Sequence, residues 1–152
     1  MKKYFYIFIF IPFLILSCDY SPIYSSKNNY NFYIEKIEFS GDAEINNIIS
    51  KKLKKYKKIN NGKKLTIIAS SSYSKISQTK NLSGKTTNYL VIIKVIFQIK
   101  KGDKSERFTS KEEFLIKNLD NKFNEISIEK IKKENSIDLI TNKLIIQITQ
   151  MQ

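Results

Sequence analysis

The sequence contains no histidine and only one cysteine, Cys18. Without histidine or a second cysteine, the chain cannot form the usual zinc sites, a Ser-His-Asp triad or a Cys-His nucleophile. It has only four glycines, and no glycine-rich phosphate-binding loop is present. The acidic residues are scattered and lie mostly beside lysines, so the pattern does not favour a catalytic carboxylate pair. The sequence therefore predicts that the protein is not an enzyme.

Negative charge is scarce. The chain has 27 Lys+Arg against 14 Asp+Glu, which gives a formal net charge of +13. Such an excess attracts polyanions, including nucleic acid, anionic lipid headgroups and the phosphates of a glycolipid. The N-terminal segment described next indicates export from the cytoplasm, which argues against nucleic acid as a partner.

The first eighteen residues have the three parts of a secretory signal peptide. Two lysines precede an apolar run over Tyr4–Leu16, and Ser17 and Cys18 follow it. The run has 13 residues, whereas a membrane-spanning helix needs about 20. Residues 1–17 are therefore predicted to be a cleaved signal peptide.

The segment Ile15-Leu16-Ser17-Cys18 resembles the lipobox of bacterial lipoproteins. In that family the cysteine thiol receives a diacylglycerol, the chain is cut just before it, and the new amine is acylated. The resemblance implies that the mature protein starts at Cys18 with a covalent N-terminal lipid and needs no other cofactor. Two or more acyl chains anchor a protein stably, whereas one chain binds reversibly. The alternative is that Cys18 is an ordinary buried thiol.

After the lipobox, residues 18–31 form a Ser-, Asn- and Tyr-rich tether, and residues 32–152 form one predicted domain. Period-two patterns predict strands over Phe32–Phe39, Lys64–Ser77, Asn88–Lys101 and Glu106–Asn118. Helical periods predict helices over Ala43–Lys58, capped by Asp42, and over Ile126–Met151. The order β-α-β-β-β-α predicts an α+β two-layer sandwich. Its sheet has four mostly antiparallel strands, with both helices on one face and the other face open.

The last predicted helix carries an approximate apolar stripe, and the part of it from Ile137 to Ile148 is expected to face the core. Asn135 interrupts this stripe, so the pattern allows a kink or a break there. The members of the stripe are Ile128, Ile131, Ile137, Ile140, Leu144, Ile148 and Met151.

Directly after Cys18 the chain reads Asp19-Tyr20-Ser21-Pro22-Ile23-Tyr24. This resembles the start of the mature LptE family, the lipopolysaccharide-assembly lipoproteins, which have Cys-Gly, an aromatic residue, a variable residue and then Pro-Leu-Tyr. Tyr20, Pro22 and Tyr24 match that pattern, and Ile23 replaces the leucine. The predicted element order and the chain length also resemble the family. The specific part of the resemblance is this short motif, and the rest is architecture.

The resemblance implies a lipid-anchored protein on the periplasmic face of the cell outer membrane. Such a protein partners and plugs an LptD-like β-barrel and assists lipopolysaccharide transport and assembly. Asp19 departs from the family, which has glycine there. In enteric bacteria, an aspartate after the lipidated cysteine is associated with inner-membrane retention. A stand-alone envelope lipoprotein that binds anionic lipid or acts as a scaffold is therefore the alternative.

The candidate contacts for lipopolysaccharide phosphates are cations on the third and fourth predicted strands and their turn. Arg107 is notable among them, because it is the only arginine and its guanidinium matches phosphate geometry. The alternative is that all of them are solvated surface cations. The candidates are Lys94, Lys100, Lys104, Arg107 and Lys111.

Tyr20, Pro22 and Tyr24 are a candidate arm that docks on the barrel. The alternative is a linker that packs on its own domain.

Overall fold

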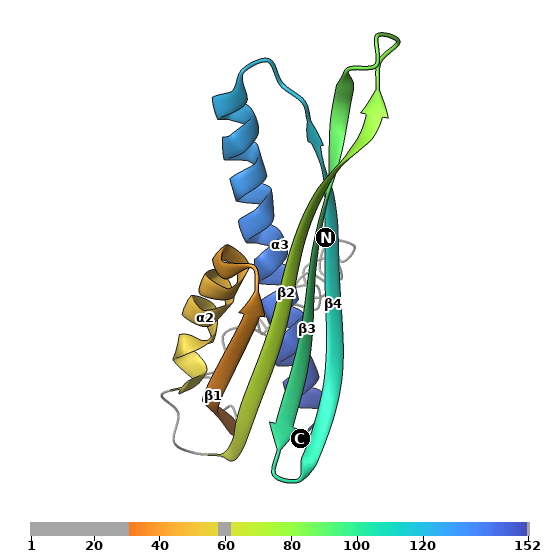
Figure 1. The fold of residues 1–152 in the computed structure, drawn as a ribbon. Helices are drawn as coiled ribbons and strands as arrows, with labels where there is room; N and C mark the ends of the chain where they lie inside the picture. Colours follow the sequence, from red (N-terminus) through yellow and green to blue (C-terminus); the bar gives the residue numbers. More distant parts are fainter. Residues whose placement is uncertain (1–30, 58–61, 152) are drawn as a thin grey trace, which may run out of the picture.

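The computed structural model of the protein describes residues 31–57 and 62–151. The predictions for the signal peptide, Cys18, Asp19 and the Tyr20–Tyr24 arm lie outside these residues. The described elements are β1 (Phe32–Gly41), α2 (Ala43–Lys57), β2 (Lys63–Lys80), β3 (Thr86–Lys101), β4 (Lys104–Lys117) and α3 (Lys122–Gln150). Figure 1 shows both helices on the same side of one sheet. The predicted α+β two-layer architecture is confirmed.

The sheet has the strand order β1-β2-β3-β4. β1 runs parallel to β2, and α2 makes the crossover between them. The other neighbours, β2–β3 and β3–β4, are antiparallel. β3 passes to β4 through Gly102 and Asp103, with Lys101 opposite Lys104, so the two strands form a tight hairpin.

The chain leaves β1 through Gly41, whose φ is 88°. A Cβ atom at this position would lie 1.9 Å from the carbonyl oxygen of Ser71, so the close approach of β2 also excludes a side chain. Directly after it, Asp42 Oδ1 accepts a 2.9 Å hydrogen bond from the amide of Ile45. This confirms Asp42 as the N-cap of α2.

A bulge in β1 explains an irregular spacing in its apolar residues. The pairing with β2 shifts between Ile34 and Lys36, which leaves Glu35 without a partner in the register. Because of this extra residue, Ile34 and Ile37 face the same side of the sheet although they are three positions apart.

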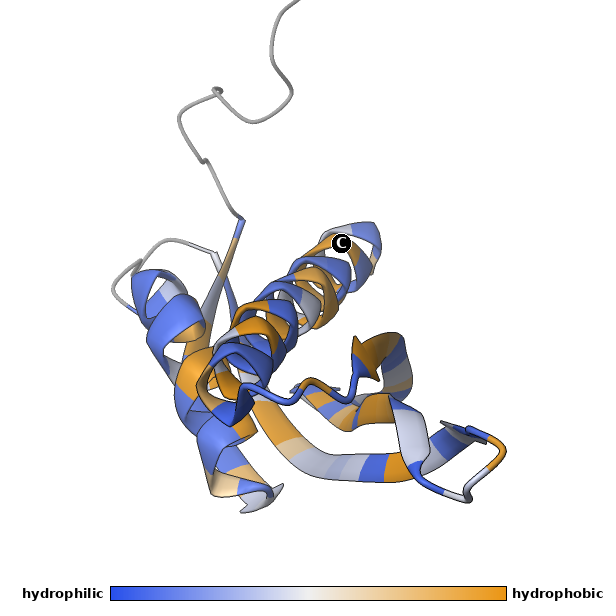
Figure 2. Cartoon of the chain, turned by 90° about the horizontal axis from the view of Figure 1, so that it is seen from above, coloured by the Kyte–Doolittle hydropathy of each residue, from blue (hydrophilic) through white to orange (hydrophobic). Residues whose placement is uncertain are grey.

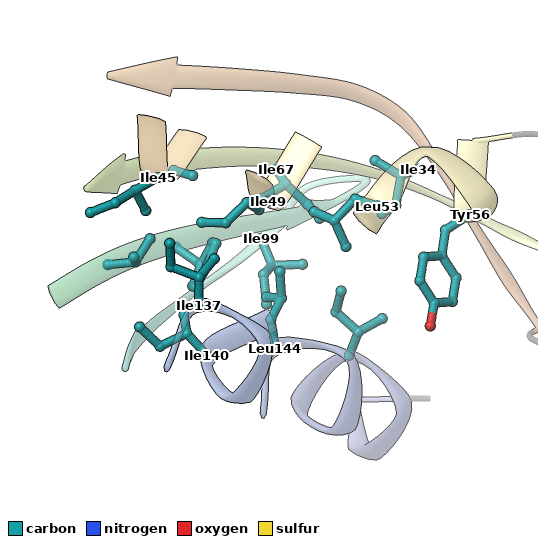
Figure 3. Packing of buried hydrophobic residues seen from close by; sticks show 14 of the residues in the cluster. Ile34, Ile45, Ile49, Leu53, Tyr56, Ile67, Ile99, Ile137, Ile140 and Leu144 are labelled. Carbon is teal, nitrogen blue, oxygen red and sulfur yellow. The ribbon is translucent and has the colours of Figure 1, made fainter. Parts of the chain in front are cut away.

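The core lies between the sheet and the two helices. Figure 2 shows apolar residues between these layers and hydrophilic ones on the outward side of α2. Figure 3 shows the close packing of isoleucine and leucine side chains from both layers. The fully buried residues include Ile45, Ile49 and Leu53 of α2, Ile67 of β2, Val91, Ile93, Val95, Phe97 and Ile99 of β3, and Ile137, Ile140 and Leu144 of α3.

α3 runs without a break through Asn135. The apolar stripe from Ile137 to Ile148 is buried, which confirms that prediction, whereas the members of the stripe at the N-terminal end of the helix are exposed. There Ile128 and Ile131 are 41% and 59% exposed. The positions that face the sheet in this part of α3 are polar instead, with Glu125 and Lys133 buried.

Different parts of the chain meet at the two ends of the domain (Figure 1). At one end of the domain β1 and β2 begin, β3 turns into β4, and both helices end. We call this end the basic end, because segments 54–57, 63–64 and 100–104 supply its lysines. At the other end β2 turns into β3 over Lys80–Thr86, and α3 begins at Lys122. We call this second end the tip end.

Candidate functional site

The face of the sheet that turns away from the helices is the candidate site. Its side chains alternate with those of the core, because successive residues of a strand point to opposite faces. On β3 and β4 this outer face carries four of the five candidate cations, namely Lys94, Lys100, Arg107 and Lys111.

The strand register groups these four cations into two pairs. Lys94 lies directly opposite Lys111, and such opposed residues have Cβ atoms about 4.5–5.5 Å apart. Arg107 lies opposite Gln98, and Lys100 lies opposite Ser105, so Lys100 and Arg107 are diagonal neighbours. On β4, the members of the two pairs, Arg107 and Lys111, are four positions apart, which is about 13 Å of strand.

Aliphatic side chains share this face with the cations. Across the sheet, Ser70, Ile96 and Thr109 form the row between the two pairs of cations. A shallow open hollow of about 300 Å³ lies beside this row, lined by Ile68, Ser70, Ile96, Gln98, Ser105 and Arg107. Farther along, Ile76, Leu90 and Leu115 form an apolar row toward the tip end. The outer face therefore offers separate cationic and apolar areas.

The neighbours of the cations set how much positive charge is available. Lys111 forms an ion pair with Glu113 on its own strand. Within residues 31–57 and 62–151, neither Lys94, Lys100 nor Arg107 forms an ion pair. At the nearby edge, Lys36 binds Glu38 at 2.6 Å. That hydrogen bond lowers the pKa of the Glu38 carboxyl, and the positive charge of Lys100 lowers it further.

Lys104 does not join the other four candidates. It lies at the β3–β4 turn, opposite Lys101. There it lines a separate open hollow with Lys101, Ser105, Glu106 and Met151. Four of the five predicted residues thus lie on the outer face, where Lys100 also borders the basic end, and Lys104 lies at the basic end alone.

Sequence reasoning missed a network of polar side chains on the helix-covered face near the tip end. Tyr73 Oη donates a hydrogen bond to Glu129 Oε1, and Lys75 Nζ lies 2.7 Å from Glu129 Oε2. Lys75 also binds Glu125 at 3.3 Å. The ammonium of Lys133 lies 4.5 Å from the centre of the Tyr73 ring and 2.6 Å from Glu44 of α2. We call Tyr73, Lys75, Glu125, Glu129 and Lys133 the ionic network.

The pKa values show that these charges stabilise one another. The hydrogen bond from Lys122 lowers the pKa of Glu125 despite its burial, with help from the Leu119 amide and Lys75. Burial raises the pKa of Glu129, but Lys75 and Tyr73 outweigh this and the net shift is downward. Burial lowers the pKa of Lys75, and the two glutamates turn its net shift upward. Burial and Glu129 together raise the pKa of Tyr73.

A signal for this network exists in the sequence. Glu125, Glu129 and Lys133 are spaced by four, in line with the buried Ile137. The same helical face therefore changes from polar to apolar along its length. Within the described ranges, no group of three or more His, Cys, Asp or Glu side chains is arranged to hold a metal ion. No described helix is long and apolar enough to cross a membrane.

The fold is shared with a solved bacterial lipoprotein. The structure is similar to that of the rare lipoprotein B from Shewanella oneidensis, with a TM-score of 0.58, 13% sequence identity, and coverage of 76% of this chain and 95% of that one. A minor lipoprotein from Acinetobacter baumannii matches with a TM-score of 0.45 and 18% identity over 76% of this chain and 93% of that one.

At these identities, the likeness to rare lipoprotein B establishes a shared fold. The sequence itself matches no family model and no curated protein. The fold resemblance predicted from the element order is therefore supported at the level of architecture.

Proposed function

We propose that this chain is an envelope lipoprotein, anchored through Cys18, that partners and plugs an LptD-like outer-membrane β-barrel and binds lipopolysaccharide. The Cys18–Tyr24 motif and the fold shared with rare lipoprotein B support this assignment. In this role the protein acts by binding and performs no catalysis.

The observation that carries the proposal is the arrangement of the outer face of the sheet. Its two cationic pairs are separated by about 13 Å between Arg107 and Lys111 on β4, with Ile96 between them and an apolar row toward the tip end. Lipopolysaccharide combines phosphates with acyl chains, so it presents the complementary groups. Arg107 offers a planar fork to a phosphate, and the lysines act as point charges.

A binding experiment on the mature lipoprotein tests the outer face. The double substitution Lys94→Gln and Lys111→Gln is expected to weaken lipopolysaccharide binding by about tenfold or more, because hydrogen bonds to charged groups contribute about 1.5–3 kcal/mol each. The matched control is Lys51→Gln with Lys130→Gln, which removes two exposed helix lysines and the same charge. Equal affinities for both double variants would refute the outer face as the site.

Co-purification tests the barrel partnership. A tagged protein expressed in its native organism is expected to bring down one large β-barrel protein. Mass spectrometry of the mature N-terminus is expected to find an acylated Cys18 as the first residue. A tagged protein that brings down no barrel would refute the partnership, and an uncut leader would refute the anchor.

Asp19 favours a second candidate function, because the LptE family has glycine at that position. In this alternative the protein is a stand-alone envelope lipoprotein that binds anionic lipid or acts as a scaffold. Membrane fractionation distinguishes the two. Residence in the inner membrane without a barrel partner supports the alternative, and Asp19→Gly is then expected to move the protein to the outer membrane.

A further inference from the structure

The basic end concentrates positive charge from separate parts of the chain. Residues 54–57, 63–64 and 100–104 contain a single acid, Asp103. Of the acids nearby, Glu35 pairs with Lys64 at 2.5 Å, and Glu106 accepts a 2.8 Å hydrogen bond from Gln147. The lysines of these three segments are Lys54, Lys55, Lys57, Lys63, Lys64, Lys100, Lys101 and Lys104.

The lysines at this end are close enough to affect one another. Burial lowers the pKa of Lys101, and the neighbouring charges of Lys63 and Lys104 lower it further. Its ammonium donates a 3.0 Å hydrogen bond to the carbonyl of Met151, just past the end of α3. On α2, Lys54, Lys55 and Lys57 are all exposed in the last turn. An opposing negative surface would relieve this crowding of like charges.

The tether reaches the folded domain at this same end. β1 begins at Phe32, and residues 19–31 join it to Cys18. Thirteen residues span at most about 45 Å, which is close to the length of about 43 Å for the 29-residue helix α3. An anchor at Cys18 therefore keeps the basic end near the bilayer surface but does not by itself orient the domain.

We propose that the basic end docks on an anionic phospholipid surface, so that the tip end points away from the headgroups. The proposal rests on the Cys18 anchor of the proposed function and not on the barrel partnership. A cluster of basic residues beside a lipid anchor strengthens membrane attachment, and this electrostatic attraction weakens as salt screens the charges. The two most exposed of the large apolar side chains, Leu82 and Phe123, lie at the opposite end, so docking through the basic end keeps them away from the bilayer.

The form of this charge favours a surface over a discrete phosphate site. The cations are all lysines, which act as point charges, and they come from α2, the start of β2 and the β3–β4 turn. The α2 lysines lie outside the candidate lipopolysaccharide contacts. They can therefore be substituted without touching the outer face of the sheet.

Vesicle co-sedimentation of the mature chain tests the docking. The chain starts at residue 18 and carries Cys18→Ser, so that no acyl chain adds affinity. We expect it to bind vesicles that contain phosphatidylglycerol far more tightly than vesicles of phosphatidylcholine alone, and to lose this binding as salt rises. The triple variant K54Q/K55Q/K57Q is expected to bind about tenfold to hundredfold more weakly.

The matched control is K80Q/K85Q/K117Q, which removes the same charge from the tip end. We expect it to retain binding within about threefold of the unsubstituted chain, since those side chains would point away from the bilayer. Glutamine is a good helix former, so α2 should persist, and circular dichroism checks this.

Three outcomes would overturn the proposal: no preference for phosphatidylglycerol, equal losses in the two triple variants, or displacement by inorganic phosphate beyond that by chloride at the same ionic strength. Equal losses would mean a diffuse attraction to net charge, and phosphate displacement would mean a discrete site. None of these outcomes tests the acylation of Cys18 or the barrel partnership. Mass spectrometry tests the first, and co-purification tests the second.

Discussion

The two halves of α3 are held to the sheet by different chemistry. From Ile137 to Ile148 the helix buries aliphatic side chains against β3 and α2. From Lys122 to Lys133 it is held by the ionic network and by the Asn121 cap. Apolar packing does not depend on pH, whereas the network depends on which groups carry charge. The half near the basic end should therefore set the global stability, and the tip half should open locally.

The largest expected effect comes from the apolar half. Leu144→Ala removes a fully buried side chain of this half of α3 from the core. Such truncations cost about 2–5 kcal/mol, because they lose burial and leave a cavity. Urea denaturation should show a lower midpoint with an unchanged slope. A loss below about 1 kcal/mol would contradict the assignment of global stability to this half.

The ionic network is expected to give a smaller and more local effect. Glu129→Gln removes the charge that binds Lys75 and accepts the Tyr73 hydroxyl. The expected cost is about 1–2 kcal/mol, because a charged hydrogen bond is replaced by a neutral one. Hydrogen exchange should speed up over residues 73–80 and 122–133, while amides of Val91–Ile99 keep their protection. Uniform loss of protection would mean that the halves are not separate.

Acid should separate the halves without any substitution. The pKa values of Glu125 and Glu129 are lowered in the folded protein. Their contribution is therefore complete above the unfolded value of about 4.3, and it is lost as the pH falls through the lower folded values. Lys75 has a raised pKa, so its contribution is lost only at pH above about 10.4. NMR at decreasing pH should show Tyr73 and α3 residues near Glu129 changing before the core isoleucines do.

The smallest expected effect compares the two N-caps. Asp42 accepts from the Ile45 amide at 2.9 Å, and Asn121 accepts from the Asn124 amide at 3.2 Å. Each change to alanine should cost about 1 kcal/mol. Asp42→Ala should lower the global urea midpoint, because α2 packs on the apolar half. Asn121→Ala should mainly speed amide hydrogen exchange at the start of α3. A lower global urea midpoint from Asn121→Ala, with only a local effect from Asp42→Ala, would contradict the difference between the two halves.

The element order, the faces of the strands and the apolar half of α3 were predictable from periodicity, because burial there follows the spacing of aliphatic residues. Asp42 was predictable as a cap from its position before a helical pattern. The exposure of Ile128 and Ile131 was not predictable from the sequence. The polar residues that take their place in the interior find their partners 50 or more positions away, in β2. Local spacing carries no information on such pairings.

The candidate site was predictable in part for the same reason. Alternation along β3 and β4 places Lys94, Lys100, Arg107 and Lys111 on one face. That Lys94 faces Lys111, and that Lys104 is separate, depends on the strand register, which the turn at Gly102–Asp103 fixes. The gathering of lysines at the basic end needed the topology, because three distant segments meet there.

The parallel pairing of β1 has a consequence for how the protein reaches this structure. β3 and β4 are joined by a two-residue turn, but Phe32 and Lys63 are paired across 31 positions (63 − 32). Closing the longer loop costs more chain entropy, so the antiparallel meander should assemble in microseconds and β1 should be the last strand to add. The strand next to the acylation site would thus remain free of the folding nucleus while the rest of the chain is already organised.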